Sequence, residues 1–318
     1  MNQAERHKRL SGYLVEPLQA TGGVSITAEH RIAMGQSRAM YILDLEYSDV
    51  SGPRTRRVVA RVEQHGHLGS DSRDEVAGMR ALHASGFPVA NVIAYEESDA
   101  LLGQPFFVMD FVEGVSTWSE DTADEYVLRL HELHSLPIDD IDFLEPVSDG
   151  KGAALQEVER WYNTYHTHIV DEPSPLLEEA AQYLRNRAPD NDRVTLVHGD
   201  PGPGNYLHHE GRITALVDWE FIHLGDPYDD WAYLIWMRGA HALTEDQWIE
   251  KIEAIAGYRL DLERLHYWKA VNFLMGVCID QTSHRIYVDG SNPAPNLLAI
   301  ATGVHLSALK RLCDTVFD

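Results

Sequence analysis

Three polar side chains between Leu196 and Glu220 are of the types and spacing that phosphoryl transfer needs. Asp200 and Asn205 lie in a loop whose two prolines and two glycines keep it out of helix and strand. Asp218 ends an apolar strand pattern that follows a turn at 209–211, so a hairpin can bring the three side chains together. Moving a γ-phosphoryl group requires a carboxylate to orient and deprotonate the acceptor hydroxyl, and oxygen ligands to hold Mg²⁺ on the phosphates. Two carboxylates and an amide meet that requirement.

The order of these residues also carries a family resemblance. His198 and Asp200 form an H-x-D pattern, Asn205 follows after four residues, and Asp218 begins a D-W-E triplet. This order resembles the catalytic and metal-binding loops of the aminoglycoside phosphotransferase and choline kinase family, relatives of protein kinases. The resemblance implies that Asp200 is the catalytic base, that Asn205 and Asp218 hold Mg²⁺, and that His198 braces the loop. A lone Asp in such a loop usually only forms a turn, but three ordered residues in a hairpin favour the site.

Within this family one branch is more similar than the others. The segments 158–162, 196–220 and 257–258 resemble the kinase domains attached to acyl-CoA dehydrogenases. The resemblance implies a kinase that uses ATP and Mg²⁺ to phosphorylate a hydroxyl of a small molecule, either a hydroxyacyl compound or another apolar hydroxy compound. Phosphorylation of an aminoglycoside or macrolide antibiotic is the alternative. A nucleotide-binding pseudokinase is a further alternative, against which the intact set of three site residues argues.

The resemblance implies a bilobal, protein-kinase-like α+β fold, and the patterns along the chain agree with it. We expect residues 1–110 to form a nucleotide-binding N-lobe, which consists of an antiparallel sheet and a helix that begins at 70–71. We expect residues 111–318 to form a larger, mostly helical C-lobe, which contains the catalytic loop, the metal site and acceptor-binding helices. Strand patterns of the N-lobe cover 25–34, 40–47, 57–62, 92–96 and 105–109. Helical patterns of the C-lobe cover 122–135, 155–168, 175–187, 245–256, 262–278 and 297–316, with a loop over 140–154.

Kinases hold the α- and β-phosphates with a cation on the third strand, which pairs with a helix glutamate. By position this cation is Arg61, in place of the usual lysine, and its planar guanidinium can bind phosphate with two donors. Glu75 shares an apolar helix stripe with Met79 and Leu82, where an acidic group needs a partner. We therefore expect an Arg61–Glu75 pair; a slightly rotated helix that exposes Glu75 is the alternative.

The comparison with kinases assigns two further groups of nucleotide contacts. Gly35 and Ser37 lie in a tight connection between the first two strands, whose backbone amides could cover the phosphates, although a single glycine in a hairpin is more often only a turn. After the fifth strand, Met109 would form the back wall of the adenine pocket. Asp110 and Val112 would read the adenine edge through main-chain groups.

Composition excludes several classes of function. With a net charge of −24 the chain of 318 residues is unsuited to bind a nucleic-acid backbone, which needs clustered Lys and Arg. No run of eighteen apolar residues appears, and no apolar segment follows the charged N-terminus, so neither a membrane span nor a secretory signal is expected. Cys278 and Cys313 lack metal-like spacing, and His131 and His134 are three residues apart without a third ligand. We expect a cytoplasmic enzyme; nothing in the sequence predicts its oligomeric state.

The acceptor region is the least defined. Between Asn272 and Ala301 the only acidic residues are Asp280 and Asp289, whereas binding of a polycation would favour clustered carboxylates. Aromatic and aliphatic residues in the same region favour a neutral or anionic acceptor with apolar parts. Loose candidates for contact with the acceptor are Trp161, Tyr165, Trp268, Asn272 and Asp280.

Overall fold

The computed structural model describes residues 1–32, 38–63, 72–170 and 172–317. The chain consists of two compact units, Met1–Glu113 and Gly114–Asp318. The sequence predicts the division at residues 110 and 111, close to the boundary between these units. Among the described residues, none of the helices combines the length and the apolar character needed to cross a membrane.

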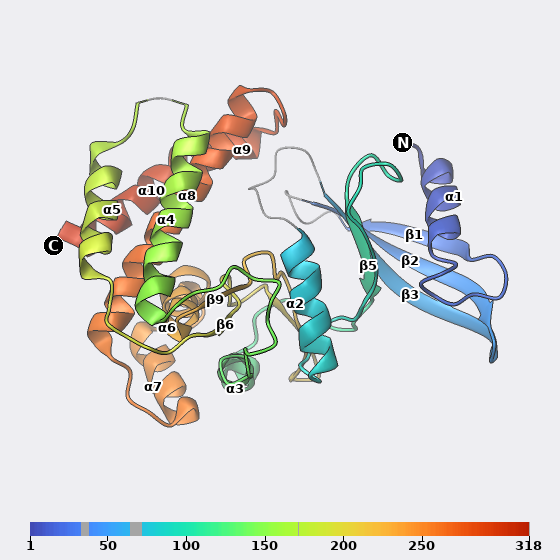
Figure 1. Ribbon diagram of the computed structural model, residues 1–318, viewed down its shortest axis with the longest axis horizontal. Coiled ribbons are helices and arrows are strands. Elements are labelled where there is room, and N and C mark those ends of the chain that lie inside the picture. Colours follow the sequence, from blue (N-terminus) through green and yellow to red (C-terminus); the bar gives the residue numbers. More distant parts are fainter. Residues whose placement is uncertain (33–37, 64–71, 171, 318) are drawn as a thin grey trace. The chain divides into compact units, whose positions relative to one another are not determined.

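The first unit contains one five-stranded sheet in the order β1-β2-β3-β5-β4, in which every neighbouring pair is antiparallel (Figure 1). Its strands are β1 (Ser25–Ile32), β2 (Arg38–Asp49), β3 (Gly52–Glu63), β4 (Val92–Glu96) and β5 (Phe106–Asp110). The expected meander of the first three strands is confirmed. Strand β3 lies in the middle of the sheet, where Arg61 faces Met40 of β2 and Phe107 of β5 in register.

Two helices belong to this unit. Helix α1 (Gln3–Tyr13) contributes to a core with the sheet, since Leu10 is fully buried together with Leu43, Val58 and Phe106. Truncating one such buried leucine to alanine costs about 2–5 kcal/mol. Helix α2 (Ser72–Ala84) buries one stripe of side chains. The expected beginning of this helix at 70–71 lies outside the described residues.

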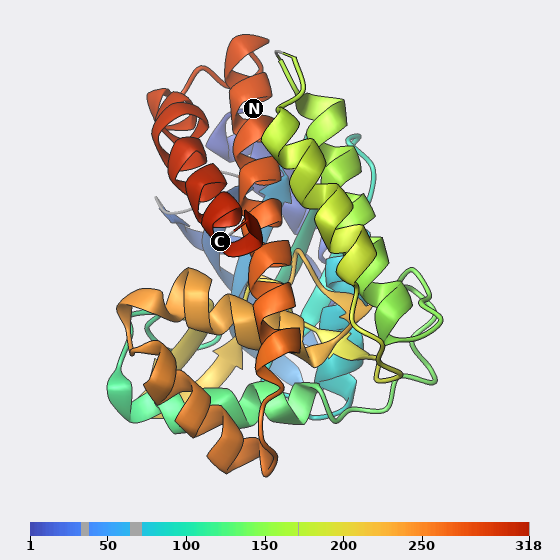
Figure 2. The same cartoon turned by 90° about the vertical axis from the view of Figure 1, so that its left-hand side faces the viewer.

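The second unit is mostly helical. In Figure 2, helices α4 and α5 (yellow-green) and helices α8 and α10 (orange to red) lie side by side. The helices are α3 (Ala123–Leu133), α4 (Gly150–His168), α5 (Pro175–Arg187), α6 (Pro227–Tyr233), α7 (Glu245–Ala256), α8 (Leu262–Val288), α9 (Pro295–Ala299) and α10 (His305–Phe317). Short 3₁₀ turns are η1 (Glu120–Thr122) and η3 (Gly239–His241), and π-helical turns are η2 (Leu234–Arg238) and η4 (Ile300–Val304).

Two boundaries differ from the prediction. Residues 150–154 are helical rather than part of a loop, because the Asp149 side chain accepts a hydrogen bond from the Gly152 amide at 2.7 Å and caps helix α4. Helix α8 continues past Cys278 to Val288. One side of this extension is buried, with Thr282 and Ser283 among its residues, although its polar sequence gives little periodicity.

Four short strands hold the loops with the predicted site. Strands β7 (Tyr206–His209) and β8 (Arg212–Leu216) form the predicted hairpin. Strand β6 (Thr195–Val197), which leads into the Asp200 loop, pairs with β9 (His223–Gly225), a strand that the sequence pattern did not indicate. The loops that follow β6 and β8 are therefore held by two separate antiparallel ladders.

Candidate active site

The loop after β6 holds Asp200 and Asn205 against each other. The amide nitrogen Nδ2 of Asn205 donates to Oδ2 of Asp200 at 2.7 Å and to the Asp200 carbonyl at 2.8 Å. Both residues are buried, with 3% and 4% of their surface exposed. Since Nδ2 makes both bonds, the remaining oxygen of the Asn205 amide is the atom that could coordinate a cation.

Asp218 follows β8 in the left-handed backbone region, with φ of 69°. The hairpin ties it to the first loop, because the Val217 amide donates to the Asn205 carbonyl at 3.0 Å. An aspartate tolerates this conformation better than most residues, but a non-glycine residue there is still strained, and such strain is typical of functional sites. Asp218 is half-buried. The structure thus brings the loops with all three predicted site residues together.

Arg238 was not identified from the sequence. It ends the π-helical turn η2, and its Nε donates to Oδ1 of Asp200 at 2.5 Å, while its second nitrogen pairs with Oδ2. Burial acts to lower the pKa of Arg238, but the hydrogen bonds and the charge of Asp200 outweigh it and raise that pKa, with smaller contributions from Tyr233 and Asp218. Single π-helical turns are frequent at functional sites. The sequence offered one signal, the lone arginine in the apolar run after Asp230.

The approach of Arg238 also explains a glycine in the catalytic loop. Gly202 has φ of 143°, and a Cβ atom there would lie 2.4 Å from Cβ of Arg238. Only glycine accommodates both the backbone conformation and this close contact. The Gly202 amide in turn donates to the Tyr126 hydroxyl at 2.6 Å, which holds the loop on helix α3.

Asp230 anchors the beginning of the catalytic loop. Its carboxylate accepts hydrogen bonds from the His198 amide at 3.0 Å, the Gly199 amide at 2.9 Å and the His134 ring at 2.8 Å. Burial opposes the charge on Asp230, but His134 and these donors outweigh it and lower its pKa. These three hydrogen bonds give Asp230 a structural role.

His198 links the two loops of the site through its ring. The Asp200 amide donates to Nδ1 at 3.3 Å, and Nε2 lies 3.1 Å from the Val217 carbonyl, to which it donates. Burial lowers the pKa of His198, although the surrounding carboxylates act in the opposite direction. A neutral ring fits one accepting and one donating nitrogen.

In the first unit, the predicted pair of Arg61 and Glu75 is present. One guanidinium nitrogen of Arg61 lies 2.6 Å from Oε1 of Glu75, and both side chains are buried. The alternative of an exposed Glu75 is therefore excluded. The Arg61 guanidinium also lies 5.8 Å from the centroid of the Phe107 ring.

The other nucleotide-binding predictions have different outcomes in the structure. Gly35 and Ser37 lie outside the described residues. Met109 and Val112 are half-buried. The Asp110 amide donates to the Asn91 carbonyl at 2.9 Å, so this amide already has a hydrogen-bond partner in the first unit. The Asp110 carboxylate pairs with Arg56, at 2.7 and 2.8 Å.

The loose acceptor candidates are all buried in the second unit. Trp161, Tyr165, Trp268 and Asn272 expose at most 3% of their surface, so they form core rather than a surface for a substrate. Asp280 differs, since its Oδ2 is buried and has no hydrogen-bond partner among the described residues. Burial raises the pKa of Asp280 to about 7.

Comparisons with protein families and with curated proteins find relatives of this chain. Residues 31–268 match the family model of the phosphotransferase enzyme family. The acyl-CoA dehydrogenase family member 11 of Pongo abelii is 26% identical over 276 residues, which cover 74% of this chain and 35% of that protein. The chain thus spans about a third of the length of this relative.

Solved structures confirm the expected protein-kinase-like fold. A Ralstonia eutropha protein assigned as an aminoglycoside phosphotransferase has a TM-score of 0.70 at 21% identity, and the match covers 97% of each chain. A thermostable mutant of an aminoglycoside phosphotransferase, in ternary complex with AMP-PNP and hygromycin B, has a TM-score of 0.62 at 20% identity, covering 96% of this chain and 97% of that one.

Proposed function

Because this chain belongs to the phosphotransferase enzyme family, a family of small-molecule kinases that act on hydroxyl groups, we propose that it uses ATP and Mg²⁺ to phosphorylate a hydroxyacyl compound or another apolar hydroxy compound. The observation that carries the proposal is the immobilised Asp200 carboxylate. Arg238 and Asn205 hold it from two sides within a buried loop.

Asp200 acts as the base in this proposal. A carboxylate offers about four lone-pair positions, and the hydrogen bonds from Arg238 and Asn205 use three of those on Asp200. The acceptor hydroxyl would donate to Oδ1, which accepts one hydrogen bond from Arg238. As that hydroxyl oxygen bonds to the γ-phosphorus, its proton passes to Asp200, and the bond from phosphorus to the β,γ-bridging oxygen breaks to release ADP.

The residues present fit the magnesium ion that the family implies. The Asn205 amide oxygen and the Asp218 carboxylate are the hard oxygen ligands that Mg²⁺ prefers, and phosphate oxygens and water would complete its shell. When bound, Mg²⁺ neutralises charge on the phosphates during transfer. Arg61, held by Glu75, would contact the α- and β-phosphates. The AMP-PNP complex of the related phosphotransferase supports the use of ATP.

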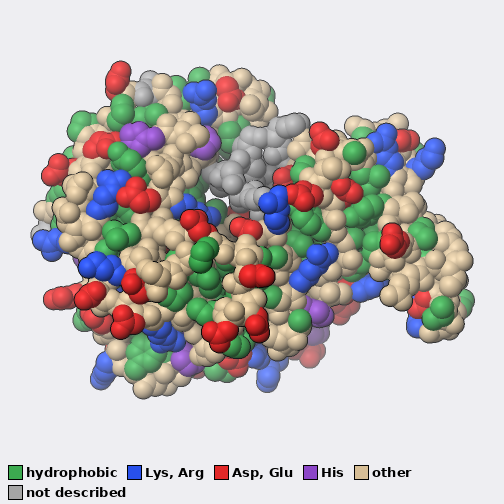
Figure 3. Space-filling view, viewed as in Figure 1, with side chains coloured by type: hydrophobic (Ala, Val, Ile, Leu, Met, Phe, Trp, Pro, Cys, Tyr) green, Lys and Arg blue, Asp and Glu red, His purple; other side chains and the backbone are tan. Residues whose placement is uncertain are grey.

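Three observations support an apolar acceptor. The relative from Pongo abelii is named as an acyl-CoA dehydrogenase family member, and acyl compounds with a β-hydroxyl are chemically close to the substrates of such an enzyme. On the face in Figure 3, acidic side chains are scattered and Lys and Arg lie among them, an arrangement that does not favour a polycationic partner on that face. Val288, Leu298 and Val304 are exposed near the C-terminal helices.

The test is release of ADP by the purified chain with a panel of acceptors. Hydroxyacyl thioesters, hydroxy acids, aromatic alcohols and aminoglycosides are compared at equal concentration, with Mg²⁺ and with EDTA. We expect saturable turnover with one of the apolar hydroxy compounds that requires Mg²⁺. Saturable turnover of aminoglycosides alone would show that the acceptor is an aminoglycoside and not an apolar hydroxy compound. ADP release that no acceptor stimulates would contradict the proposed reaction.

A further inference from the structure

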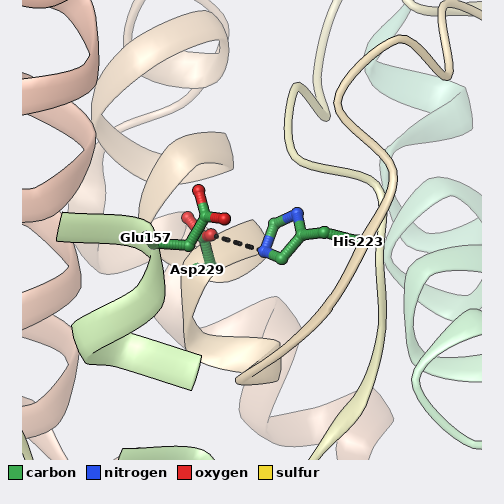
Figure 4. Close-up of side chains that lie close together, drawn as sticks. All are labelled: Glu157, His223 and Asp229. Carbon is green, nitrogen blue, oxygen red and sulfur yellow. Dashed lines mark ion pairs between the residues drawn. The ribbon is translucent and has the colours of Figure 1, made fainter. Parts of the chain in front are cut away.

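A second cluster of ionisable side chains lies apart from the Asp200 site and has no part in the proposed reaction. Glu157 of α4, His223 of β9 and Asp229 of α6 each present one ligand atom, and these atoms lie within 4.8 Å of one another (Figure 4). Glu157 and Asp229 expose 4% of their surface, and the His223 side chain exposes 12%. Two buried carboxylates so close together require a positive charge between them.

The hydrogen bonding of His223 prepares its ring for a cation. Nδ1 lies 2.9 Å from the Phe221 carbonyl, to which it donates. Nε2 is buried and makes no hydrogen bond to any residue that the structure describes. Histidines that bind metals almost always donate their second nitrogen to a carbonyl or carboxylate in this way, which directs the lone pair of the other nitrogen at the ion.

Asp229 faces the same nitrogen of His223. Its Oδ2 lies 3.3 Å from Nε2, the distance of an ion pair, and this position also suits two ligands of one cation. Zinc binds histidine nitrogen at about 2.0–2.1 Å and carboxylate oxygen at about 2.0–2.2 Å, so two ligands in a tetrahedral site lie about 3.3 Å apart. The observed separation of Nε2 and Oδ2 matches this value, as it would for an ion pair, and the ligand atom of Glu157 lies within 4.8 Å of both.

Glu157 is oriented by its own neighbours. Trp161 donates from Nε1 to Oε2 at 3.0 Å, and Arg160 donates to Oε1 at 3.3 Å. Ligating carboxylates are commonly held by such donors. The same contacts also fit the competing interpretation, in which a protonated His223 forms ion pairs with both carboxylates. Burial disfavours that charge, but Glu157 and Asp229 outweigh burial and raise the pKa of His223 to about 9.

From this geometry we propose that Glu157, His223 and Asp229 form a zinc-binding site. One imidazole and two carboxylates are a ligand set for Zn²⁺ with an open fourth position for water, whereas Mg²⁺ prefers oxygen ligands only. The ion would connect α4 and α6 to β9, the strand that pairs with β6 and so supports the Asp200 loop. It would therefore stabilise the second unit without touching the reacting groups.

The test measures zinc and stability in the whole chain. Protein stripped with EDTA is incubated with a small excess of ZnSO₄, passed over a desalting column and analysed for zinc by mass spectrometry, and its melting temperature is recorded with and without zinc. We expect about one zinc ion per chain and a higher melting temperature, because an ion that binds only the folded state stabilises it. Co²⁺ in the unmutated chain should give the visible absorption bands of a site with tetrahedral geometry.

Three variants separate this site from others. His223→Asn should lose the bound zinc and the shift in melting temperature. Two control variants should retain both the bound zinc and the shift in melting temperature. His209→Asn removes an exposed histidine at the end of β7, and Asp218→Ala removes a proposed magnesium ligand. Zinc binding that His223→Asn leaves unchanged, or an unmutated chain that retains no zinc, would overturn the proposal in favour of the protonated ion-pair cluster. If His223→Asn does not fold, the Co²⁺ spectrum of the unmutated chain tests the proposal. Absorption bands of a tetrahedral site support it, and their absence overturns it.

Discussion

At the scale of single residues, Asp200 carries the proposed chemistry. Asp200→Asn keeps the shape of the side chain but removes the base, and we expect turnover to fall by about a hundredfold to ten-thousandfold, the contribution of one positioned general base. ATP binding should persist. Steady-state rates and a melting curve on the same preparation check this, with the exposed Asp192→Asn as the matched control. Activity close to that of the unmutated enzyme would show that Asp200 is not the base.

Asp218 has a different expected defect. Asp218→Ala removes a charged oxygen ligand, so the affinity for Mg-ATP should fall and the stabilisation by Mg-ATP should disappear. At a ligand concentration of about 100 times Kd that stabilisation amounts to about 2.7 kcal/mol in the unmutated protein. Isothermal calorimetry with Mg-ATP measures the change, and Asp192→Ala serves as control. Unchanged affinity would mean that Asp218 is not a ligand.

Arg238 is a positioning residue for Asp200. Its guanidinium holds both carboxylate oxygens, and a lysine cannot reproduce such a two-pronged contact. We expect Arg238→Met to lower kcat by about a hundredfold, the effect of a small misplacement of a reacting group, with little change in KM for ATP. Arg238→Lys should recover only part of the loss. Equal activity of both variants and the unmutated enzyme would assign Arg238 a purely structural role.

At the scale of elements, a buried ion pair joins β3 to α2. Glu75→Gln removes the charge of one partner, and breaking a buried pair in this way destabilises a protein by about 3–5 kcal/mol. Urea unfolding followed by circular dichroism measures the loss. The exposed pair of Arg73 and Glu97 provides the control, because Glu97→Gln should change stability by less than about 1 kcal/mol.

The same substitution tests the role of the pair in nucleotide binding. If Arg61 contacts the phosphates, Glu75→Gln should raise the KM for ATP as well as lower stability, whereas Glu97→Gln should leave the KM unchanged. A lower stability with an unchanged KM would limit the pair to holding strand and helix together.

At the scale of the whole molecule, the net charge of −24 attracts cations without defining a site for them. Binding of an aminoglycoside through this general field should weaken strongly as ionic strength rises from about 0.01 to 0.15 M, since the Debye length falls from about 30 to 8 Å. The KM of a neutral hydroxy acceptor should stay nearly constant over the same range. Titrations at four salt concentrations make the comparison, and an aminoglycoside Kd that does not respond to salt would indicate a specific site.

The sequence by itself determined the catalytic loop and the hairpin, because the information for them is local. Prolines and glycines around Asp200 define a loop, and the strand pattern from Ile213 to Val217 predicts a strand just before Asp218, which is observed as β8. The pair of Arg61 and Glu75 was also predictable, since a buried acid on a helix stripe demands a cation and the strand before it offers one.

Only the tertiary structure decided the contacts that join distant parts of the chain. Arg238 reaches Asp200 across 38 residues because a π-helical turn follows α6, and no local pattern encodes that turn. Glu157, His223 and Asp229 meet because β9 pairs with β6 and places His223 beside α4 and α6. Such contacts depend on how side chains pack after the elements have formed, and sequence spacing carries little of that information.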